Sequence, residues 1–527
     1  MVWHIVMKDL RLLWVVVLGV GTIHLAAAVL RAWLGVFPES HQLVVIADFL
    51  PLVSMLGIVV LNLAAMHQDA VPGVRQDWLI RPIKRGDLIL AKLLFVMLMV
   101  QGPLMLADLS EGLLDGFTLA ATFGAAVAHN LATLCYVSLP AVMIGAVTRN
   151  LAESFMVAMV GLIIYATVFL VGAVMVFGVK TSVGGTGLVW MFDAIWYTLA
   201  VAGTAVVISL QFFRRKTTMA RWLIGAGGAA IILSSFLPWR PAFALQKSLS
   251  KDPTSANAIV VVFNPRLGPF KVPPGAGVAT TTGLYLPLSL VGVPSAAVVI
   301  TDRANVRITD INGRALYEGR SNLSVDGVGS IQDAQLDVRQ SETANASIDI
   351  HQRIFIPAAI YAKLSNQAVT MEIDYYLTLF RADATYAVPA SGGNVKLEGL
   401  GWCSTRIDGD GDDVQLRCLH TRRTPSCFTA FLEHISSGLR NPETHVCRAD
   451  YAPFSRNLLP DALSRLGGDI PFFDRSGLTH YPIDGSKLAD SRLVIKTYEP
   501  RDHFTRHLNI PNVRLADFAA APAIAQP

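Results

Sequence analysis

Long apolar runs recur through the first 240 residues of this 527-residue chain, and they constrain its fold more than any other feature. A run of about 20 predominantly apolar residues is long enough to cross the hydrocarbon core of a membrane as a helix. The fourth run is 31 residues long, so Pro140 marks a place where a kink or a re-entrant segment could lie. We predict seven membrane spans, at residues 12–30, 43–66, 88–107, 117–147, 155–179, 188–213 and 219–239.

The distribution of charge predicts the orientation of these spans. The formal net charge is only +4, so nucleic acid is not an expected partner. Residues 1–240 contain 15 basic and 11 acidic residues and the remainder contains 28 of each, so the whole excess lies in the membrane half. The positive-inside rule puts the N-terminus in the cytoplasm, and seven spans would carry the C-terminus outside. The predicted cytoplasmic side contains Lys8, Arg11, Arg75, Arg81, Lys84, Arg85, Arg149, Arg214, Arg215, Lys216 and Arg221, and the opposite side contains Glu39, Glu111 and Asp115.

The chemistry of the chain changes near residue 240. Eight of the nine Trp residues precede this point, and helical periodicity gives way to short β-like runs between turn signals. We therefore predict a transmembrane domain at 1–240 and a mostly β, sandwich-like domain at 241–527, with a few helices such as 428–439. We expect the protein in a bacterial inner membrane with its C-terminal domain in the periplasm. The predicted β runs are 258–263, 296–301, 306–311, 347–355, 369–379 and 493–498.

Four of the five cysteines lie in the exported half, where an oxidising compartment favours disulfides. A hairpin centred on Asp410 and Gly411 would pair Cys403 with Cys418 across its ladder, at a Cα separation of about 4.5 to 5.5 Å. A second bond, between Cys427 and Cys447, follows by elimination. The fifth cysteine, Cys135, lies inside the fourth span and is expected to be a buried apolar residue.

Residues 76–92 contain the most informative motif. Trp78 precedes the pair Arg81 and Pro82, and a basic turn then leads to Lys92 at the start of the third span. This stretch resembles the permease subunits of type-2 ABC transporters, which often carry Trp-x-x-Arg-Pro followed by hydrophobic and basic residues and Leu-x-x-Lys. The amphipathic segment 1–13 looks like the interfacial elbow helix of that family. The resemblance covers residues 1–215, the family's six-span unit.

The resemblance implies that the loop between spans two and three docks on a separate ATP-binding subunit. It places the coupling contacts at Asp77, Trp78, Arg81, Pro82, Lys84 and Arg85, and a second set at Arg149, Asn150 and Glu153. It also implies a homodimer or a heterodimer with a similar permease. Charge alone favours an ordinary cytoplasmic anchor for this loop. The seventh span and about 287 exported residues depart from the family and leave the handling of the substrate open.

The chain itself lacks the phosphate-binding loop of an ATPase, since no G-x-x-x-x-G-K-[ST] occurs in it. We therefore expect no cofactor in this chain, with ATP and magnesium on the partner subunit, and we do not expect it to be an enzyme.

Polar residues inside spans are candidates for a transport pathway, because they usually face a cavity or a partner helix. Four are singled out: Asp48, His129, Asn130 and Asp193. A simple hydrogen bond between helices, or a misplaced span boundary, explains such residues equally well. Asp48 and Asp193 lie within six residues of the starts of their spans, which favours the boundary explanation.

The exported half offers no positive case for catalysis or for a metal site. Asp408, Asp410 and Asp412 imitate a calcium loop, but Asp413 and Leu419 stand where an EF-hand needs Gly and Glu. The histidines at 503 and 507 have helical spacing without the Glu of a zinc protease motif, and no G-x-S-x-G occurs.

The sequence therefore predicts the membrane-spanning subunit of an ABC exporter whose exported domain receives the substrate or docks an envelope partner. The alternatives are a membrane-anchored binding or sensing protein of the periplasm, and an envelope hydrolase.

Overall fold

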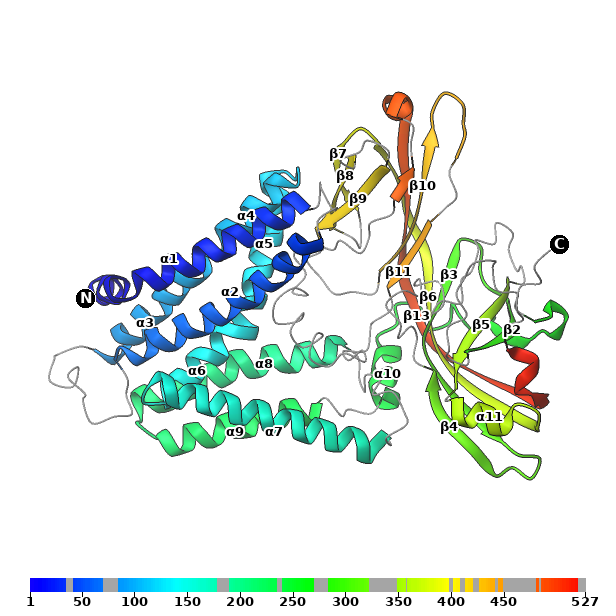
Figure 1. Cartoon of the computed structure of the whole chain (residues 1–527), viewed down its shortest axis with the longest axis horizontal. Helices are drawn as coiled ribbons and strands as arrows, with labels where there is room; N and C mark the ends of the chain where they lie inside the picture. Colours follow the sequence, from blue (N-terminus) through cyan, green and yellow to red (C-terminus); the bar gives the residue numbers. More distant parts are fainter. Residues whose placement is uncertain are drawn as a thin grey trace.

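The computed structural model contains a helical membrane region followed by a mostly β domain (Figure 1). The residues that it describes are 1–34, 41–69, 84–177, 189–234, 239–269, 283–321, 348–356, 358–397, 401–407, 413–419, 426–440, 444–448, 480–482 and 485–519.

The helical region begins with α1 (Val2–Leu34) and α2 (His41–His67). The next rod combines α3 (Arg85–Phe95), the π-helix η2 (Val96–Gln101) and α4 (Gly102–Leu114). The rod after it combines α5 (Leu119–Thr133), η3 (Leu134–Ser138) and α6 (Leu139–Val147). The remaining helices are α7 (Leu151–Phe177), α8 (Val189–Ile208) with η4 (Ser209–Phe213), α9 (Thr217–Ser234) and α10 (Trp239–Ser248).

Six stretches in the described part of the chain are long and apolar enough to cross a membrane, which confirms the first six predicted spans. They are Val2–Trp33, Phe49–His67, Arg85–Leu114, Leu119–Val147, Leu151–Val168 and Ile195–Phe213. The seventh predicted span corresponds to α9, which packs against α8 but is not one of the six. Arg221 and the polar residues at both ends of α9 lower its hydropathy, so a seventh crossing remains a prediction.

The fourth span passes Pro140 as a helix rather than as a re-entrant segment. A π-helical segment, η3, ends two residues before Pro140, and η2 likewise ends two residues before Pro103. Proline has no backbone N–H and its ring crowds the preceding turn, and the wider π-helical turn is one way to accommodate it.

The β domain contains three sheets with strand orders β1-β2-β5, β11-β10-β13-β6-β3-β4 and β12-β9-β8-β7. The six-stranded sheet curls into a half-barrel. Its two longest strands, β6 (Ala368–Pro389) and β13 (Ser491–Arg514), are paired antiparallel with three register shifts, and such bulges bend and twist a sheet. The other strands are β1 (Val260–Phe263), β2 (Gly283–Val291), β3 (Ala297–Thr309), β4 (Ala315–Ser321), β5 (Ile348–Phe355), β7 (Gly393–Leu397), β8 (Gly401–Ile407), β9 (Asp413–Leu419), β10 (Ser426–His434), β11 (Thr444–Arg448) and β12 (His480–Pro482).

Short helical elements complete the domain, and two apolar cores hold it together. One core lies between the three-stranded sheet and the half-barrel, around Leu286, Ile373 and Tyr375. The other lies between the half-barrel and the four-stranded sheet, around Leu416 and Phe428. Strands β6 and β13 contribute residues to both cores. The short helices are η5 (Pro265–Leu267), α11 (Ala358–Leu364), η8 (Gly485–Asp490) and η9 (Leu515–Phe518).

Two sequence predictions for this half are wrong in detail. The predicted helix 428–439 begins as β10, because Phe428, Ala430 and Leu432 alternate into one core while the strand pairs with β11 and β13. The predicted strands 296–301 and 306–311 form the single strand β3, whose register shift lies between Thr301 and Arg303.

The predicted disulfide between Cys403 and Cys418 is present, and the two residues are directly opposite in the β8–β9 ladder. Cys427 lies opposite Cys447 in the β10–β11 ladder, which is the register that the second predicted bond requires. Cys135 is free and buried, as predicted.

Candidate functional site

The predicted coupling residues divide between the described and undescribed parts of the chain. Asp77, Trp78, Arg81 and Pro82 lie in the segment 70–83, outside the described residues. Lys84 precedes α3 and Arg85 is its first residue. The three residues of the second predicted set all lie in the short turn between α6 and α7, which can be examined directly.

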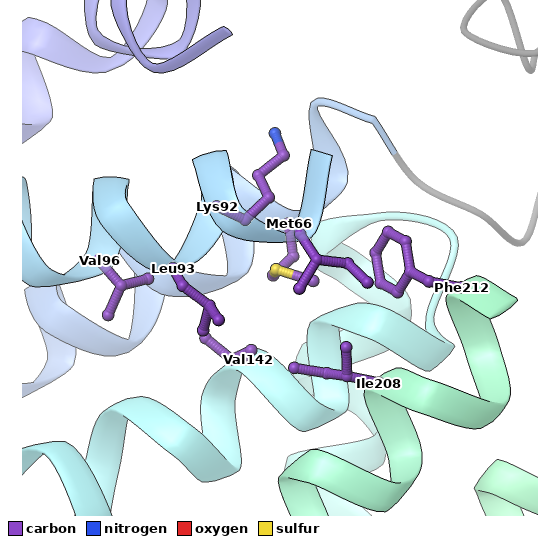
Figure 2. Close-up of a pocket in the computed structure, with 8 residues that line it drawn as sticks. Met66, Lys92, Leu93, Val96, Val142, Ile208 and Phe212 are labelled. Atoms are coloured by element: carbon purple, nitrogen blue, oxygen red, sulfur yellow. The ribbon is translucent and has the colours of Figure 1, made fainter. Parts of the chain in front are cut away.

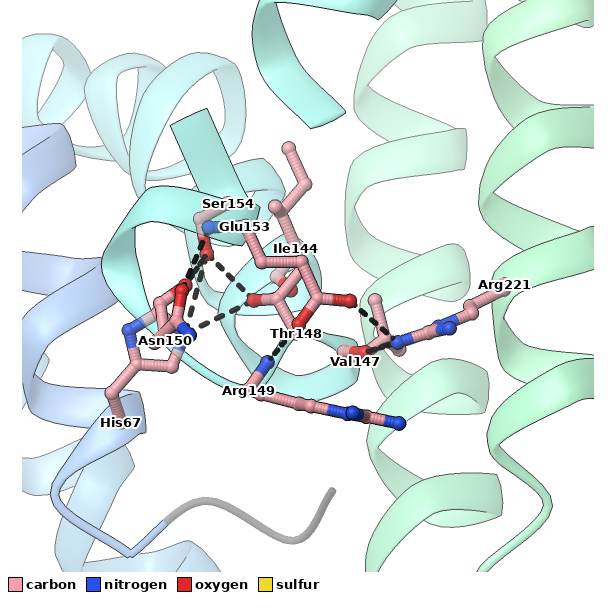
Figure 3. A network of polar contacts seen from close by, with 9 residues as sticks. All are labelled: His67, Ile144, Val147, Thr148, Arg149, Asn150, Glu153, Ser154 and Arg221. Atoms are coloured by element: carbon pink, nitrogen blue, oxygen red, sulfur yellow. Dashed lines mark hydrogen bonds and ion pairs between the residues drawn. The ribbon is translucent and has the colours of Figure 1, made fainter. Parts of the chain in front are cut away.

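The turn between α6 and α7 is held by side chains that cap the start of α7 (Figure 3). The N–H of Glu153 donates to Oδ1 of Asn150 at 2.8 Å, and the N–H of Arg149 donates to Oε2 of Glu153 at 2.7 Å. The first N–H groups of a helix have no partner within the helix, so an Asn followed three residues later by Glu satisfies them. This turn is therefore a defined structural element.

A triangle of hydrogen bonds ties that turn to the end of α2. Nε2 of His67 lies 3.0 Å from Oγ1 of Thr148 and 3.2 Å from Oγ of Ser154, and these two hydroxyls are 2.6 Å apart. Thr148 and Ser154 are buried. His67 is the last residue of α2, the helix that precedes segment 70–83. Its hydrogen bonds therefore join the helix before the first predicted coupling loop to the turn that contains the second (Figure 3).

Two arginines connect the remaining helix ends on this face. Arg221 of α9 pairs with Glu153 at 2.9 Å and also donates to the carbonyl of Val147, while Nη1 of Arg85 donates to the carbonyl of Phe213 at 2.7 Å. The ends of α2, α3, α6, α7, η4 and α9 thus belong to two sets of polar contacts, which we call the basic-face network.

A second group of charges joins α1 to the same face. Lys92 of α3 lies 2.7 Å from both Asp9 and Asp69, and Lys8 lies 2.9 Å from Asp69. Asp9 is fully buried and the Lys92 side chain is 4% exposed. Burial alone would raise the pKa of Asp69, but the charges and hydrogen bonds of Lys92 and Lys8 lower it below its usual value. Lys92, the last residue of the 76–92 motif, is thus a buried ion-pair partner rather than a side chain that reaches the membrane surface.

Two of the four predicted pathway residues are brought together at the opposite ends of the helices. Asp108 of α4 lies 2.7 Å from Nδ1 of His129 and 3.0 Å from Nδ2 of Asn130, both on α5. Asp48 lies on α2 and Asp193 on α8, and their side chains lie outside the described residues. The contacts of His129 and Asn130 are hydrogen bonds between helices, and they identify Asp108 as a partner that the sequence analysis missed.

Asp108 and Glu111 lie on one face of α4, and Asp115, the residue that ends the helix, continues their row. The spacing of three and four residues places them in line along a helix. All three are at most 3% exposed. Each contacts a different element: Asp108 contacts α5, Glu111 pairs with Arg31 of α1 at 2.9 Å, and Asp115 pairs with Arg417 of β9 at 2.9 Å. We call this row the α4 acidic stripe.

The end of the stripe is where the β domain meets the helices. The Asp115–Arg417 pair is buried on both sides, at 2% and 6% side-chain exposure, and Arg406 approaches the same carboxylate at 3.5 Å. Nδ2 of Asn394 donates to the carbonyl of Gly116, whose φ of +86° forms the α4–α5 turn. Phe117 belongs to an apolar cluster that includes Leu419 and Trp402 of the domain. We call this contact the domain junction.

The region after α9 provides a second attachment. Phe243 and Gln246 of α10 pack on β6 and β13, where Nε2 of Gln246 lies 3.0 Å from Nδ1 of His503. Oγ1 of Thr378 lies 2.8 Å from the same nitrogen and donates to Asp302. Burial lowers the pKa of His503 to about 4, so this ring is neutral at pH 7.

The described residues contain no group of three or more His, Cys, Asp or Glu side chains that could hold a metal ion. His503 and His507 both lie on strand β13, where residues four apart are separated by about 13 Å, so they do not have the spacing of a shared ligand pair. His507 pairs with Asp374 instead. The residues Asp408, Asp410 and Asp412, which imitate a calcium loop in the sequence, lie outside the described residues.

Comparison with known proteins gives no relative from which a role could be inferred. No protein-family model matches the sequence. No curated protein matches it with significant similarity. The assignment of function therefore depends on the motif at residues 76–92 and on the geometry described above.

Proposed function

We propose that this chain is the membrane-spanning subunit of an ATP-driven exporter of the type-2 ABC class. The motif at residues 76–92 motivates the class. The observation that carries the proposal is the basic-face network. A transport subunit that is driven by a separate ATPase must transmit a displacement of its cytoplasmic loops to its helices, and this network connects the two. The six candidate spans and the disulfide in the β domain support an integral membrane protein whose C-terminal domain is extracytoplasmic.

The rod made of α3, η2 and α4 is the route by which such a displacement would cross the membrane. It extends over 30 residues from Arg85 to Leu114, or about 45 Å at the helical rise. Its first residue, Arg85, contacts η4, and its far end is followed at once by Asp115 of the domain junction. The π-helical segment η2 interrupts the rod, and such segments are common sites of bending.

In this mechanism, closure of the ATPase pushes on residues 78–85 and on the turn at 148–153. The His67 triangle and the Glu153–Arg221 pair make the two loops and α9 move together. The rod then carries the motion to the domain junction, and access switches between the cytoplasm or inner leaflet and the outside. ATP and magnesium bind to the partner subunit in this proposal. The β domain receives the substrate, guards the exit or docks an envelope partner.

The partners follow from the same proposal. A separate ATP-binding subunit docks on the basic face, and the chain pairs with a second copy or with a similar permease. A membrane-anchored binding or sensing protein of the periplasm is the rival function, and it would need no ATPase at all.

The test is to purify the complex from native membranes and to measure its ATPase rate. We expect Arg81→Ala combined with Lys84→Ala to abolish the response of ATP hydrolysis to the permease while the permease keeps its thermal stability. Arg11→Ala is the matched control, because Arg11 is an exposed cation at the same end of the protein but on α1. An ATPase rate that responds equally in the double variant and in the control would contradict the proposed coupling.

A further inference from the structure

A group of ionisable side chains is largely buried between α1, α4 and α5, one to two helical turns from the domain junction. Arg31 of α1 lies 2.9 Å from Glu111 of α4, and Nδ1 of His129 of α5 lies 2.7 Å from Asp108 of α4. His24 of α1 adds a second imidazole, because it interacts electrostatically with both His129 and Arg31. We call these five residues the α4 charge group.

His24 is the member of the group that lacks a partner. The residue is 8% exposed, and its Nε2 atom is buried with no hydrogen-bond partner among the described residues. A buried polar atom in this state is unfavourable and calls for an explanation. An imidazole nitrogen accepts a proton, and a proton needs no cavity, so a proton is the ligand that this arrangement favours.

The charges of the group balance only when it holds one proton. Arg31 is a cation and both Glu111 and Asp108 are carboxylates, so the group has one net negative charge while its imidazoles are neutral. A proton on His129 cancels that charge and makes the 2.7 Å contact with Asp108 an ion pair. A second proton, on His24, would add a net positive charge close to Arg31. Unpaired charge inside a membrane is costly, so we expect the group to hold one proton rather than none or two.

The charges next to the group have partners of their own and leave this balance unchanged. Asp115, the next acid in the α4 acidic stripe, contacts Arg417 and Arg406 of the β domain. Helices α4 and α5 also approach each other closely here, since a Cβ atom on Gly112 would lie 2.2 Å from Cγ2 of Thr122. This packing leaves little room for water to compensate an unpaired carboxylate.

The buried charges at the opposite end of the helices are balanced without a proton. Lys92 lies 2.7 Å from both Asp9 and Asp69, and Lys8 completes two cations for two carboxylates. The ammonium group of Lys92 points away from the apolar side chains around a cavity of about 10 Å³, which has room for about one water molecule (Figure 2). The α4 charge group therefore differs from this cluster in the one respect that a bound proton would correct.

We propose that the α4 charge group is a proton-binding site, which holds one exchangeable proton on His129 next to the carboxylate of Asp108. Asn130 donates to the same carboxylate at 3.0 Å, so two side chains of α5 are held by Asp108. The bound proton fastens α5 to α4 through an ion pair, and that ion pair is lost as the pH rises. Because the turn between these helices includes Asp115 and Phe117 of the domain junction, the proton determines how firmly the turn is held. The site requires no ATPase, so its failure would leave the exporter proposal unchanged.

The test is an NMR titration of the full-length chain in mild detergent, with histidine isotope-labelled at Cε1. His129→Gln and His24→Gln each remove one signal and so identify both. We expect His129 to take up a proton between about pH 8 and pH 5 while His24 stays neutral. Asp108→Asn keeps an oxygen that accepts from the N–H of His129 but removes the charge. The affinity for the proton should therefore fall at least about tenfold, which moves the midpoint of the titration by at least about one pH unit.

The variant without His129 gives a second, independent result. In His129→Gln the proton should move to His24, whose signal then titrates in the range where it did not before. Asp87→Asn is the matched control, because Asp87 lies in the first turn of α3 on the same rod, and the exposed His4 of α1 gives a reference signal. This control should leave the midpoint of His129 unchanged. An equally unchanged midpoint in Asp108→Asn, or a His24 that does not titrate in His129→Gln, would overturn the proposal.

Hydrogen exchange tests the effect of the proton on the helices. At about pH 6, Asp108→Asn should speed the exchange of the α5 amides about tenfold relative to Asp87→Asn, because the charged hydrogen bond to His129 is lost. The difference should shrink as the pH rises and the unaltered chain loses its proton. Thermal unfolding confirms that every variant folds, and equal exchange in the two variants would show that the proton does not fasten α5.

Discussion

The domain junction makes the sharpest prediction, because its central ion pair is buried on both sides. Replacing Asp115 with Asn removes the carboxylate that Arg417 and Arg406 both contact at the junction. Removing one partner of a buried ion pair costs about 3 to 5 kcal/mol, because the other charge remains desolvated and uncompensated. We therefore expect the junction to open at least about 100-fold more often in this variant.

Hydrogen exchange followed by mass spectrometry measures that opening directly. Asp115→Asn should accelerate exchange in β8, β9 and the α4–α5 turn, and leave β6 and β13 protected, because local opening involves only the elements that lose contacts. Arg406→Gln is the matched control. Its contact is 3.5 Å long and its side chain is 29% exposed, so its loss should cost at most about 1 kcal/mol.

A double-mutant cycle then isolates the pair itself. Arg417→Met alone should also open the junction, because the buried carboxylate of Asp115 loses its closest ion-pair partner, whereas the combination with Asp115→Asn should be less damaging than the sum of the two single changes. Additive effects, or unchanged exchange in β9 when Asp115 is replaced, would refute the conclusion that this pair fastens the domain to the helices.

Three further predictions concern the other contacts. The folded-state pKa of His503, about 4, lies below the ordinary value of 6.5, so between these pH values the unfolded chain binds a proton that the folded chain does not. The stability of the folded chain is therefore lost as the pH falls from 6.5 toward 4, by up to about 3 kcal/mol. A thermal-unfolding series in which His503→Gln shows the same pH slope as the unaltered chain would contradict this. Cys403→Ser combined with Cys418→Ser should destabilise the β domain by about 3 kcal/mol for a loop of 15 residues, and peptide mapping without reduction should recover Cys427 linked to Cys447; a linkage of Cys427 to Cys403 would be incompatible with the observed ladders. Asn150→Ala should weaken the start of α7 by about 1 kcal/mol and speed exchange of the Glu153 amide, whereas Asn150→Asp, which keeps a capping oxygen, should not.

Much of the architecture could be predicted from periodicity and charge. Apolar length alone located six spans, and the symmetry of the hairpin around Asp410 gave the correct partner for Cys403. The error at residues 428–439 has a simple cause, because a short apolar segment is ambiguous between a helix and a strand. Only its pairing with β11 and β13 decides the matter.

The buried ionic contacts show where sequence reasoning ends. The spacing of Asp108, Glu111 and Asp115 at the end of an apolar run was a readable signal that one face of α4 is polar, since charges inside a span require partners. The partners themselves were not readable. Arg417 is 302 residues from Asp115, and only the folded domain brings it there. The role of His67 could not be predicted either, because its partners Thr148 and Ser154 are 81 and 87 residues away in the sequence and only the fold brings them to the end of α2.

The measurement that tests the central claim most directly is the composition of the complex isolated from native membranes. If the chain is the transport subunit of an ATP-driven exporter, purification of the full-length protein in mild detergent recovers a second polypeptide that binds and hydrolyses ATP, and Arg81→Ala combined with Lys84→Ala reduces its recovery while the protein stays folded. A well-folded chain that is repeatedly isolated without any nucleotide-binding subunit would contradict the account and favour a membrane-anchored binding or sensing protein.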